Sequence, residues 1–521
     1  MNKIYVVDLS NEEIEVKEYS SKENAYGRGL AIELVEKYGT FESERYSAEN
    51  VMVFAPGILT GTLTPSTGRM VLATKEGKGL GLQISNITGE LPQKLASLDI
   101  AAIVIKGKSK RKGTYLYINE NSIELRNNLA LMGKSVSEII SIIREQYGSD
   151  SGMIGIGIAG DMMIPLSTFF STYKEGIPEF YCLRGNMGDI LGSKNFKGIV
   201  VDNKNFFNSS CANTLGLSIE AKKIAKIITE NPICGTALPG YGSITLMKIL
   251  KREGYIEQSE KKAQIARTFD GEKINKTCSP LCVIGCLNRH SNTTSDFFTS
   301  PAESEVNAAL EEKCQIADIK FSKLINQKAF QLGLDSTEFI FSCSLFAKTQ
   351  GITPTKDLIL ELLDEIEKGS LIGRVVGGRT FGIQKLYTDS SDFINEVTRP
   401  SIKEESNFRV NLSKKYEEFS DMGDMELLYT QIYILENLGF CIFSSFALID
   451  NEDALHSMAK LLSYKSGIDI NVKDLISYAR DSLHKELEFF KKSALYNIET
   501  NIPEFTKVLY RYFSKKEAPI N

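Results

Sequence analysis

The sequence has little of what several protein classes require. Its most apolar stretches, residues 100–105 and 153–165, are shorter than the roughly 18 residues that cross a bilayer or are broken by glycine and aspartate. No long basic run occurs, and 61 Lys and Arg residues face 66 Asp and Glu residues. Nine cysteines in 521 residues are too few, and odd in number, for a disulfide framework. These deficits argue against a membrane span, a nucleic-acid partner and a disulfide scaffold.

What the sequence does contain is typical of a folded chain. Hydrophobic residues make up 42% and charged residues 24% of the total, as in globular proteins. At roughly 150 residues per domain, the length predicts about three domains. The first dozen residues turn acidic and carry no export signal, so we expect a cytoplasmic protein with reduced thiols.

Glycine and β-branched residues divide the chain unevenly. Of the 40 glycines, 23 lie in residues 1–200, together with short β-branched runs at 4–9, 51–54 and 101–105. Ser10-Asn11 has the composition of a turn between two strands. We therefore expect an α+β fold, with a sheet-rich first domain over residues 1–205 followed by mostly helical domains.

Helical periodicity predicts the remaining elements. The predicted helices cover 25–38, 136–147, 217–229, 303–319, 358–368, 424–437 and 472–492. A Gly-rich stretch at 369–382, which we expect to be irregular, and a polar one at 389–406 indicate a further boundary. The predicted domains are thus 1–205, 206–380 and 381–521.

Three cysteines stand close together in the middle of the chain. Cys278, Cys282 and Cys286 fall within nine residues, and Pro280 and Gly285 argue against a continuous helix between them. A flexible loop of this kind supplies several thiolates to one iron-sulfur cluster or one zinc ion. No second Cys pair or His pair of finger type follows, which favours iron and sulfur over zinc. Three buried, apolar thiols are the remaining interpretation.

A fourth thiol is needed for either kind of site. Cys441 is the best candidate, because it follows Gly439, which we expect to end a helix in the left-handed conformation. Considered alone, Cys441 has the pattern of a buried core thiol. The site therefore depends on a contact between positions more than 150 residues apart.

Around these cysteines the sequence resembles the aldehyde:ferredoxin oxidoreductase family. The resemblance is broad before residue 205 and reduced to short segments after it. It rests on Gly27–Ala31, Ala55–Gly61, Thr67–Arg69, Ser85-Asn86, Arg184-Gly185 and Leu191–Lys197, and then on Ala302–Glu305, Leu332–Asp335 and Leu438–Cys441.

The resemblance implies a specific chemistry. It implies a tungsten or molybdenum bis-pyranopterin centre, with Mg between the pterin phosphates, beside a 4Fe-4S cluster. It also implies that an aldehyde or related small carbonyl compound is oxidised and that electrons pass through the cluster to ferredoxin or a similar carrier. An oligomer is compatible with it. The implied cluster ligands are Cys278, Cys282, Cys286 and Cys441.

The resemblance also assigns cofactor contacts. Arg69 would lie between cluster and pterin, Asn86 would bond a pterin edge, and Glu305 would move a proton near the metal. The implied cofactor-binding residues are Arg69, Asn86, Gly89, Arg184, Asp335, Glu436 and Phe440. Simpler interpretations exist: salt bridges for the arginines, a solvated helix carboxylate for Glu305, and a helix N-cap for Asp335, with Glu338 completing a capping box.

The chain departs from the family pattern at several positions. Its first cysteine gap is one residue longer than usual, and Ile87-Thr88-Gly89 stands where two adjacent glycines are expected. Phe330 and Glu436 occupy the leading Asp positions of two pterin segments. Phe330 cannot accept a hydrogen bond, so a pterin contact is lost there.

Histidines are missing as well. The family has a histidine near the metal and a Glu-x-x-His iron site between subunits, and none of His290, His456 and His484 matches the first. The departures support a second hypothesis: an accessory iron-sulfur protein or electron relay without pterin. A structural zinc site is a third.

The loop that carries Cys278, Cys282 and Cys286, called the cluster loop from here on, has basic neighbours. Lys273, Lys276, Arg289 and His290 flank the three cysteines and would form a cationic landing patch for an acidic electron carrier. Their simpler role is to solvate the loop.

Overall fold

The computed structural model describes most of the chain. The described residues are 2–20, 25–78, 81–173, 180–182, 184–242, 273–292, 295–299, 301–387, 412, 416–492, 509 and 512–513.

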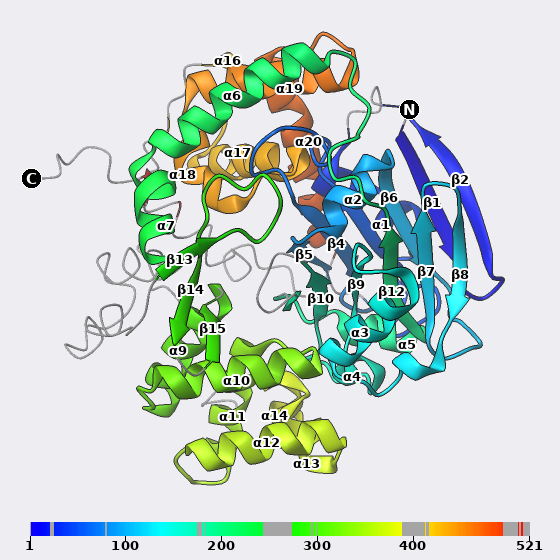
Figure 1. The fold of residues 1–521 in the computed structure, drawn as a ribbon, viewed down its shortest axis with the longest axis vertical. Coiled ribbons are helices and arrows are strands. Elements are labelled where there is room, and N and C mark those ends of the chain that lie inside the picture. The colour runs from blue at the N-terminus through cyan, green and yellow to red at the C-terminus, as the bar shows by residue number, and fades with distance from the viewer. Residues whose placement is uncertain are drawn as a thin grey trace, which may run out of the picture.

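Two six-stranded mixed sheets fill the first 205 residues (Figure 1). The first sheet has the order β2-β1-β6-β3-β4-β5 and consists of β1 (Asn2–Asp8), β2 (Glu13–Tyr19), β3 (Met52–Pro56), β4 (Met70–Lys75), β5 (Leu82–Ile87) and β6 (Ile100–Lys106). The second has the order β11-β10-β9-β12-β7-β8 and consists of β7 (Thr114–Asn119), β8 (Ile123–Asn127), β9 (Gly152–Ile156), β10 (Phe169–Thr172), β11 (Phe180–Cys182) and β12 (Phe196–Asp202). The hairpin expected at Ser10-Asn11 is confirmed by the β1–β2 register.

The sheets stack because their strands are apolar on both faces. In β3, Met52 and Phe54 point into a core between the two sheets, whereas Val53 and Ala55 point into a core beneath helices. The helices on that side include α1 (Gly27–Tyr38), and α3 (Val136–Tyr147) covers the far face of the second sheet. The result is a layered arrangement of helix, sheet, sheet and helix.

Several short helices connect the strands. They are α2 (Leu91–Ser97), η2 (Leu129–Leu131), α4 (Ile158–Asp161) and α5 (Gly188–Ser193). Lys194 and Lys197, which follow α5, are buried cations with structural contacts. The Lys194 ammonium donates to the carbonyls of Asn50 at 2.5 Å and Gly107 at 3.1 Å, and Lys197 bonds Asp161 at 2.8 Å.

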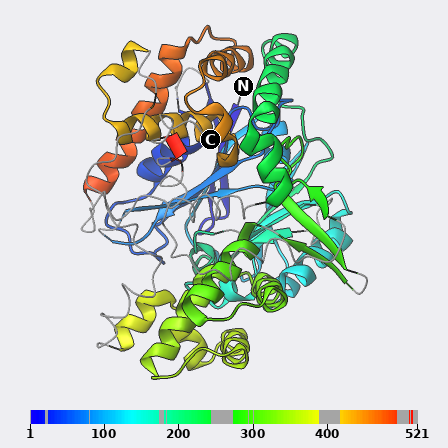
Figure 2. The ribbon, with the colours of Figure 1, turned by 90° about the vertical axis from the view of Figure 1, so that its left-hand side faces the viewer.

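The chain beyond residue 205 is mostly helical, as expected. It contains α6 (Thr214–Glu230), the π-helix η3 (Ile233–Ala237), α7 (Leu238–Tyr241), a small antiparallel sheet of β13 (Lys273–Lys276), β14 (Leu287–Asn292) and β15 (Ser295–Thr299), then α9 (Pro301–Cys314), α10 (Ile319–Leu332), α11 (Ser336–Thr349), α12 (Lys356–Lys368), α13 (Leu371–Val376), α14 (Arg379–Leu386), α16 (Glu417–Ser420), α17 (Asp424–Leu438), η6 (Ile442–Ser444), α18 (Ser445–Leu448), α19 (Glu452–Ser466) and α20 (Val472–Lys491). Helices α9–α14 and helices α17–α20 lie at opposite ends of the molecule (Figure 2).

Two helix predictions need correction. The helix predicted over 303–319 ends at Cys314, because Gln315 adopts a left-handed φ of 58° and Asp318 caps a new helix. The stretch 369–382, predicted to be irregular, forms α13 and α14, since the Ser370 side chain caps a further turn. Among the described residues, no helix combines the length and apolar character that crossing a bilayer demands.

Candidate metal and cofactor site

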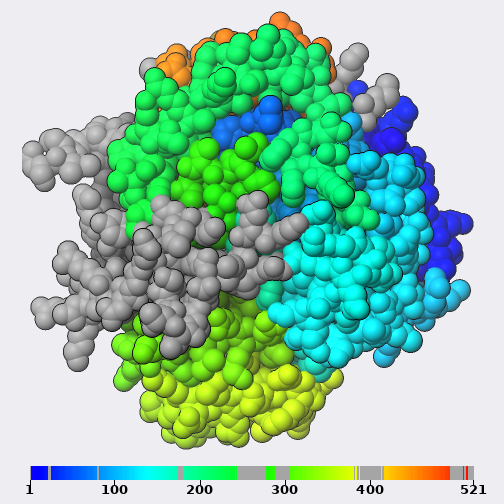
Figure 3. All heavy atoms as spheres, viewed as in Figure 1, coloured from blue at the N-terminus to red at the C-terminus, as the bar shows by residue number. Residues whose placement is uncertain are grey.

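The three-cysteine segment is a loop, as predicted, between β13 and β14. Its chain reverses at Leu281 and Gly285, whose φ values are 56° and 62°. The amide of Ser66 donates to the carbonyl of Leu281 at 3.0 Å, and the Ser66 hydroxyl accepts from the amide of Val283 at 3.3 Å. The loop (bright green) therefore lies against the segment after β3 (blue), and both reach the surface in Figure 3.

The same serine holds the distant fourth cysteine. Helix α17 ends at Leu438 with Gly439 at φ 91°, as the sequence predicts. The chain then turns so that the amide of Cys441 donates to the carbonyl of Ser66 at 2.8 Å. Backbone bonds of one residue thus fix both the cluster loop and Cys441.

The four thiols lie within electrostatic reach of one another. Burial raises the pKa of Cys282 to about 12, and the thiols of Cys278 and Cys441 add to this. Burial likewise raises the pKa of Cys278 and of Cys286, with further contributions from the other thiols. Within the described ranges no three His, Cys, Asp or Glu side chains are gathered as one metal ion requires.

Two donors face these sulfur atoms. Nη2 of Arg69 donates to Sγ of Cys441 at 3.1 Å. Burial lowers the pKa of Arg69, but the thiols of Cys441 and Cys278 raise it, and the net shift is upward. The hydroxyl of Thr88, directly after β5, lies 3.6 Å from Sγ of Cys278. These two donors stabilise negative charge on the sulfurs of Cys441 and Cys278 and so oppose the effect of burial, which raises the pKa of the buried thiols.

A buried ion-pair network continues from β5. The amide of Asn86 donates to Oε1 of Glu436 at 2.7 Å, and Arg28 donates to Oε2 of the same carboxylate at 2.6 Å. Arg28 also donates hydrogen bonds to both carboxylate oxygens of Glu486, at 2.7 and 2.8 Å. Its guanidinium lies 4.6 Å from the ring centroid of Tyr433. Two implied pterin contacts, Asn86 and Glu436, thus bond each other.

A second network surrounds Arg184. Its guanidinium bonds the carboxylate of Glu305 and lies 3.8 Å from Asp335 and 3.9 Å from Glu338, and its carbonyl accepts from the Ser85 hydroxyl at 2.5 Å. Glu305, which the simpler interpretation made a solvated helix carboxylate, is thus partly buried in an ion pair.

Asp335 is an N-cap, as the simpler interpretation predicts. Its side chain accepts from the amides of Thr337 and Glu338 at 3.1 Å. The predicted capping box is wrong, because the Asp335 amide donates instead to the carbonyl of Leu166.

The remaining predicted residues are backbone or core positions. Gly89 has φ 114°, and Ser171 fills the space where a side chain would stand. Phe440 is buried in the core beneath the first sheet. Phe330 packs in the core of the second sheet, where its carbonyl accepts from the thiol of Cys182 at 3.4 Å. The cofactor roles of Gly89 and Phe440 stay predictions.

Sequence reasoning gave no role to three residues of this site. Arg28 lies between two glycines of a family segment, which was a usable signal. Glu486 stands on the buried face of α20, where a carboxylate calls for a partner. Thr88 was noted only as a departure from the expected glycines.

The predicted cationic patch lies outside the described side chains. Lys273 and Lys276 belong to β13 and Arg289 and His290 to β14, and the structure describes only the backbone of these four residues. His456 contacts Tyr416 at 3.2 Å, and His484 contacts Glu426 at 2.9 Å.

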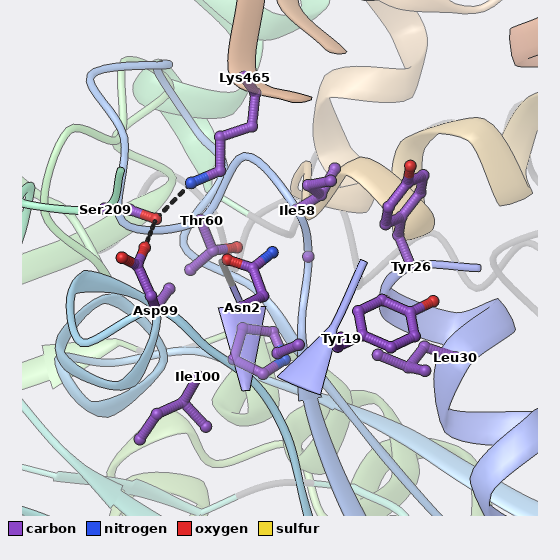
Figure 4. A pocket seen from close by; sticks show the side chains of 15 residues that line it. Asn2, Tyr19, Tyr26, Leu30, Ile58, Thr60, Asp99, Ile100, Ser209 and Lys465 are labelled. Carbon is purple, nitrogen blue, oxygen red and sulfur yellow. Dashed lines mark hydrogen bonds between the residues drawn. The ribbon is translucent and has the colours of Figure 1, made fainter. Parts of the chain in front are cut away.

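A small cavity lies elsewhere in the fold (Figure 4). It encloses about 20 Å³ among Tyr19, Tyr26, Ile58 and neighbouring side chains, space for one water molecule. Its polar end is a chain in which Lys465 donates to the Ser209 hydroxyl and Ser209 donates to Asp99 at 3.2 Å. These bonds fix the segment after β12, so the polar residues at this end of the cavity have a structural role.

Fold and site together agree with the comparisons to known proteins. The model of the family "Aldehyde ferredoxin oxidoreductase, N-terminal domain" matches residues 4–203, the part with the two sheets. Residues 4–203 therefore form a domain similar to the N-terminal domain of that family.

Particular relatives give the extent of the likeness. The tungsten-containing aldehyde ferredoxin oxidoreductase of Pyrococcus furiosus is 30% identical over 344 residues, which cover 63% of this chain and 55% of that protein. The protein of the same name from Thermococcus kodakarensis is 28% identical over 344 residues, with the same coverage. The chain thus spans about half the length of these curated relatives.

A solved structure is similar over the whole fold. The active-site complex BamBC of benzoyl coenzyme A reductase, in complex with 1,5-dienoyl-CoA, has a TM-score of 0.75 and covers 98% of this chain and 93% of that chain. At 19% identity this likeness establishes the fold alone.

Proposed function

We propose that this chain is an oxidoreductase that oxidises an aldehyde or related carbonyl compound and passes the electrons singly through a 4Fe-4S cluster to ferredoxin or a similar carrier. We place it in the cytoplasm, with domains at 1–205, 206–380 and 381–521. The proposal is carried by the mutual electrostatic interaction of Cys278, Cys282, Cys286 and Cys441, together with the hydrogen bond from Arg69 to Cys441.

The thiols fit an iron-sulfur cluster in number. A 4Fe-4S cluster is held by four cysteine thiolates that stand around it, not by donors on one atom. The described thiols interact electrostatically in every pairing, yet no three gather as a single zinc ion requires. Arg69 offsets the negative charge of the cluster ligands through its bond to Cys441.

The polar residues beside the cysteines fit a pterin in kind. The amide of Asn86 and the guanidinium of Arg184 are donors for a pterin edge and a phosphate, and Asp335 and Glu436 are acceptors. We propose that these four hold the bis-pyranopterin of a tungsten or molybdenum centre. When bound, such a centre supplies the two-electron oxidation of the carbonyl carbon.

Glu305 is the proposed acid-base group. Its carboxylate stands on α9 in an ion pair with Arg184, whose own contacts to Asp335 and Glu338 fix the guanidinium. A carboxylate oxygen held in this way accepts and returns a proton during oxidation of a hydrated aldehyde.

Anaerobic purification and elemental analysis test the proposal. We expect tungsten or molybdenum together with about four iron atoms per chain. Cys282→Ala is expected to abolish the visible cluster absorption, whereas Cys343→Ala, a buried thiol among the helices after residue 300, is expected to retain it. Iron-free protein that contains one zinc, or an unchanged spectrum of Cys282→Ala, contradicts the proposal.

A second candidate is an accessory iron-sulfur protein or electron relay that lacks pterin. It is favoured by Phe330, whose side chain packs in a hydrophobic core. It is also favoured by the hydrogen bond between Asn86 and Glu436, because two residues that the resemblance assigns to the pterin bond each other. Iron without tungsten or molybdenum selects this function over the first.

A further inference from the structure

Thr88 is a buried threonine beside the cluster loop. It follows β5 directly, in the segment Ile87-Thr88-Gly89 that departs from the family pattern. The register of β5 places Ile87 opposite Met70, so the chain leaves the sheet beside Gly68 and Arg69. The Thr88 side chain is consequently buried, at 8% exposure, next to the cluster loop.

The hydroxyl has three acceptors within reach. The carbonyls of Gly68 and Cys278 each lie at 3.4 Å, and Sγ of Cys278 lies at 3.6 Å. The carbonyl distances are long for an O–H donor, whose bonds to oxygen are typically about 2.7–2.8 Å. Neither carbonyl therefore holds the proton firmly. A thiolate at Cys278 carries a full negative charge and is the strongest acceptor of the three.

We propose that Thr88 donates a hydrogen bond to Sγ of Cys278 and thereby raises the reduction potential of the cluster. The inference rests on the proposed 4Fe-4S site. One-electron reduction adds a negative charge that is shared by the cysteine sulfurs, so a donor on sulfur stabilises the reduced form more than the oxidised one. Arg69 acts in the same sense on a second ligand, Cys441.

The experiment is a potentiometric titration of the anaerobically purified full chain with dithionite, followed by electron paramagnetic resonance. Loss of a hydrogen bond of about 1 kcal/mol changes the reduction equilibrium about fivefold. The midpoint of Thr88→Val is therefore expected to be about 40 mV more negative, at 59 mV per tenfold change for one electron. Thr88→Ser, which keeps the hydroxyl, is expected to retain the original midpoint.

Thr67→Val is the matched control. This buried threonine bonds only the carbonyls of Leu59 and Thr64, so its loss is expected to leave the midpoint unchanged. A midpoint of Thr88→Val equal to that of the original chain, or equal shifts in Thr88→Val and Thr88→Ser, overturns the inference. If Thr88→Val does not assemble the cluster, Thr88→Ala replaces it.

A second readout is resonance Raman spectroscopy. Exchange into D2O is expected to shift an iron–cysteine sulfur band more in the original chain than in Thr88→Val, because only the variant lacks the Thr88 proton while both keep the exchangeable protons of Arg69. Equal shifts contradict the inference while leaving the cluster in place. A chain without any cluster overturns the proposed function instead.

Discussion

Replacing Arg28 is expected to destabilise the fold more than replacing any other ion-pair residue of the site. Its guanidinium stands between the carboxylates of Glu436 and Glu486, whose side chains are each 9% exposed. Arg28→Met removes the cation and leaves two buried carboxylates that face each other. Because breaking a buried pair leaves an uncompensated charge, we expect the free energy of unfolding to fall by about 3–5 kcal/mol.

Arg480 provides a matched control, because it lies on α20, the helix that carries the Arg28 partner Glu486. It pairs with Glu426 at 2.8 Å and Asp421 at 3.2 Å, but the Asp421 side chain is 64% exposed. Exposed pairs contribute about 0–1 kcal/mol, so Arg480→Met is expected to have little effect. Neutralising a freed carboxylate in the double variant Arg28→Met with Glu486→Gln is expected to recover part of the loss.

The assay is guanidinium denaturation of anaerobically purified protein, followed by far-UV circular dichroism. The midpoint is expected to fall for Arg28→Met, to stay close to the original for Arg480→Met, and to rise again in the double variant. Equal midpoints for the two single variants would refute the reasoning, because burial would then not decide the cost. A double variant less stable than Arg28→Met would refute the charge argument.

Three further predictions concern the scaffold. Burial lowers the pKa of Lys194 to about 8, against about 10.4 in the unfolded chain, so the unfolded state binds more protons in that window and stability rises with pH. In denaturant titrations, the free energy of unfolding of the original chain, relative to that of Lys194→Met, is expected to rise by about 3 kcal/mol between pH 7 and 10.5. Parallel pH profiles of the two proteins would contradict this. Gly439 has φ 91°, and a side chain there would meet the Thr60 hydroxyl, so Gly439→Ala is expected to displace Cys441 and lower the iron content. Gly467 is a similar cap on α19, and Gly467→Ala is expected to retain the iron. Equal iron contents in the two variants argue against a positioning role of Gly439. Ser135→Ala removes the capping box of α3 and is expected to cost about 1 kcal/mol in thermal unfolding, with no change if the cap is redundant.

Local sequence signals were sufficient for most of the fold. The β-branched runs and the turn at Ser10-Asn11 predicted the first strands, because alternation and turn chemistry act over a few residues. The helix break at Gln315 was missed, since a left-handed non-glycine residue carries no strong signature. The helices within 369–382 were missed because glycines there are tolerated in short, capped turns.

The candidate site was predictable only in part. Gly439 and the cysteine spacing are local features, and both indicated the correct local structure. That Ser66 would bind the cluster loop and Cys441 at once depends on contacts between three distant segments, which no periodicity encodes. The pairing of Asn86 with Glu436 was hidden for the same reason, although both residues had been assigned to one cofactor.

The longer first cysteine gap is taken up by a chain reversal at one surface residue. The gap between Cys278 and Cys282 has one residue more than the family pattern, and the chain takes up this length by a reversal at Leu281. A left-handed leucine costs about 1 kcal/mol or more. The bond from Ser66 to the Leu281 carbonyl offsets that cost, and the Leu281 side chain, at 39% exposure, points away from the core. The longer gap is therefore absorbed at the surface, and the thiol of Cys278, on its N-terminal side, still lies beside Thr88.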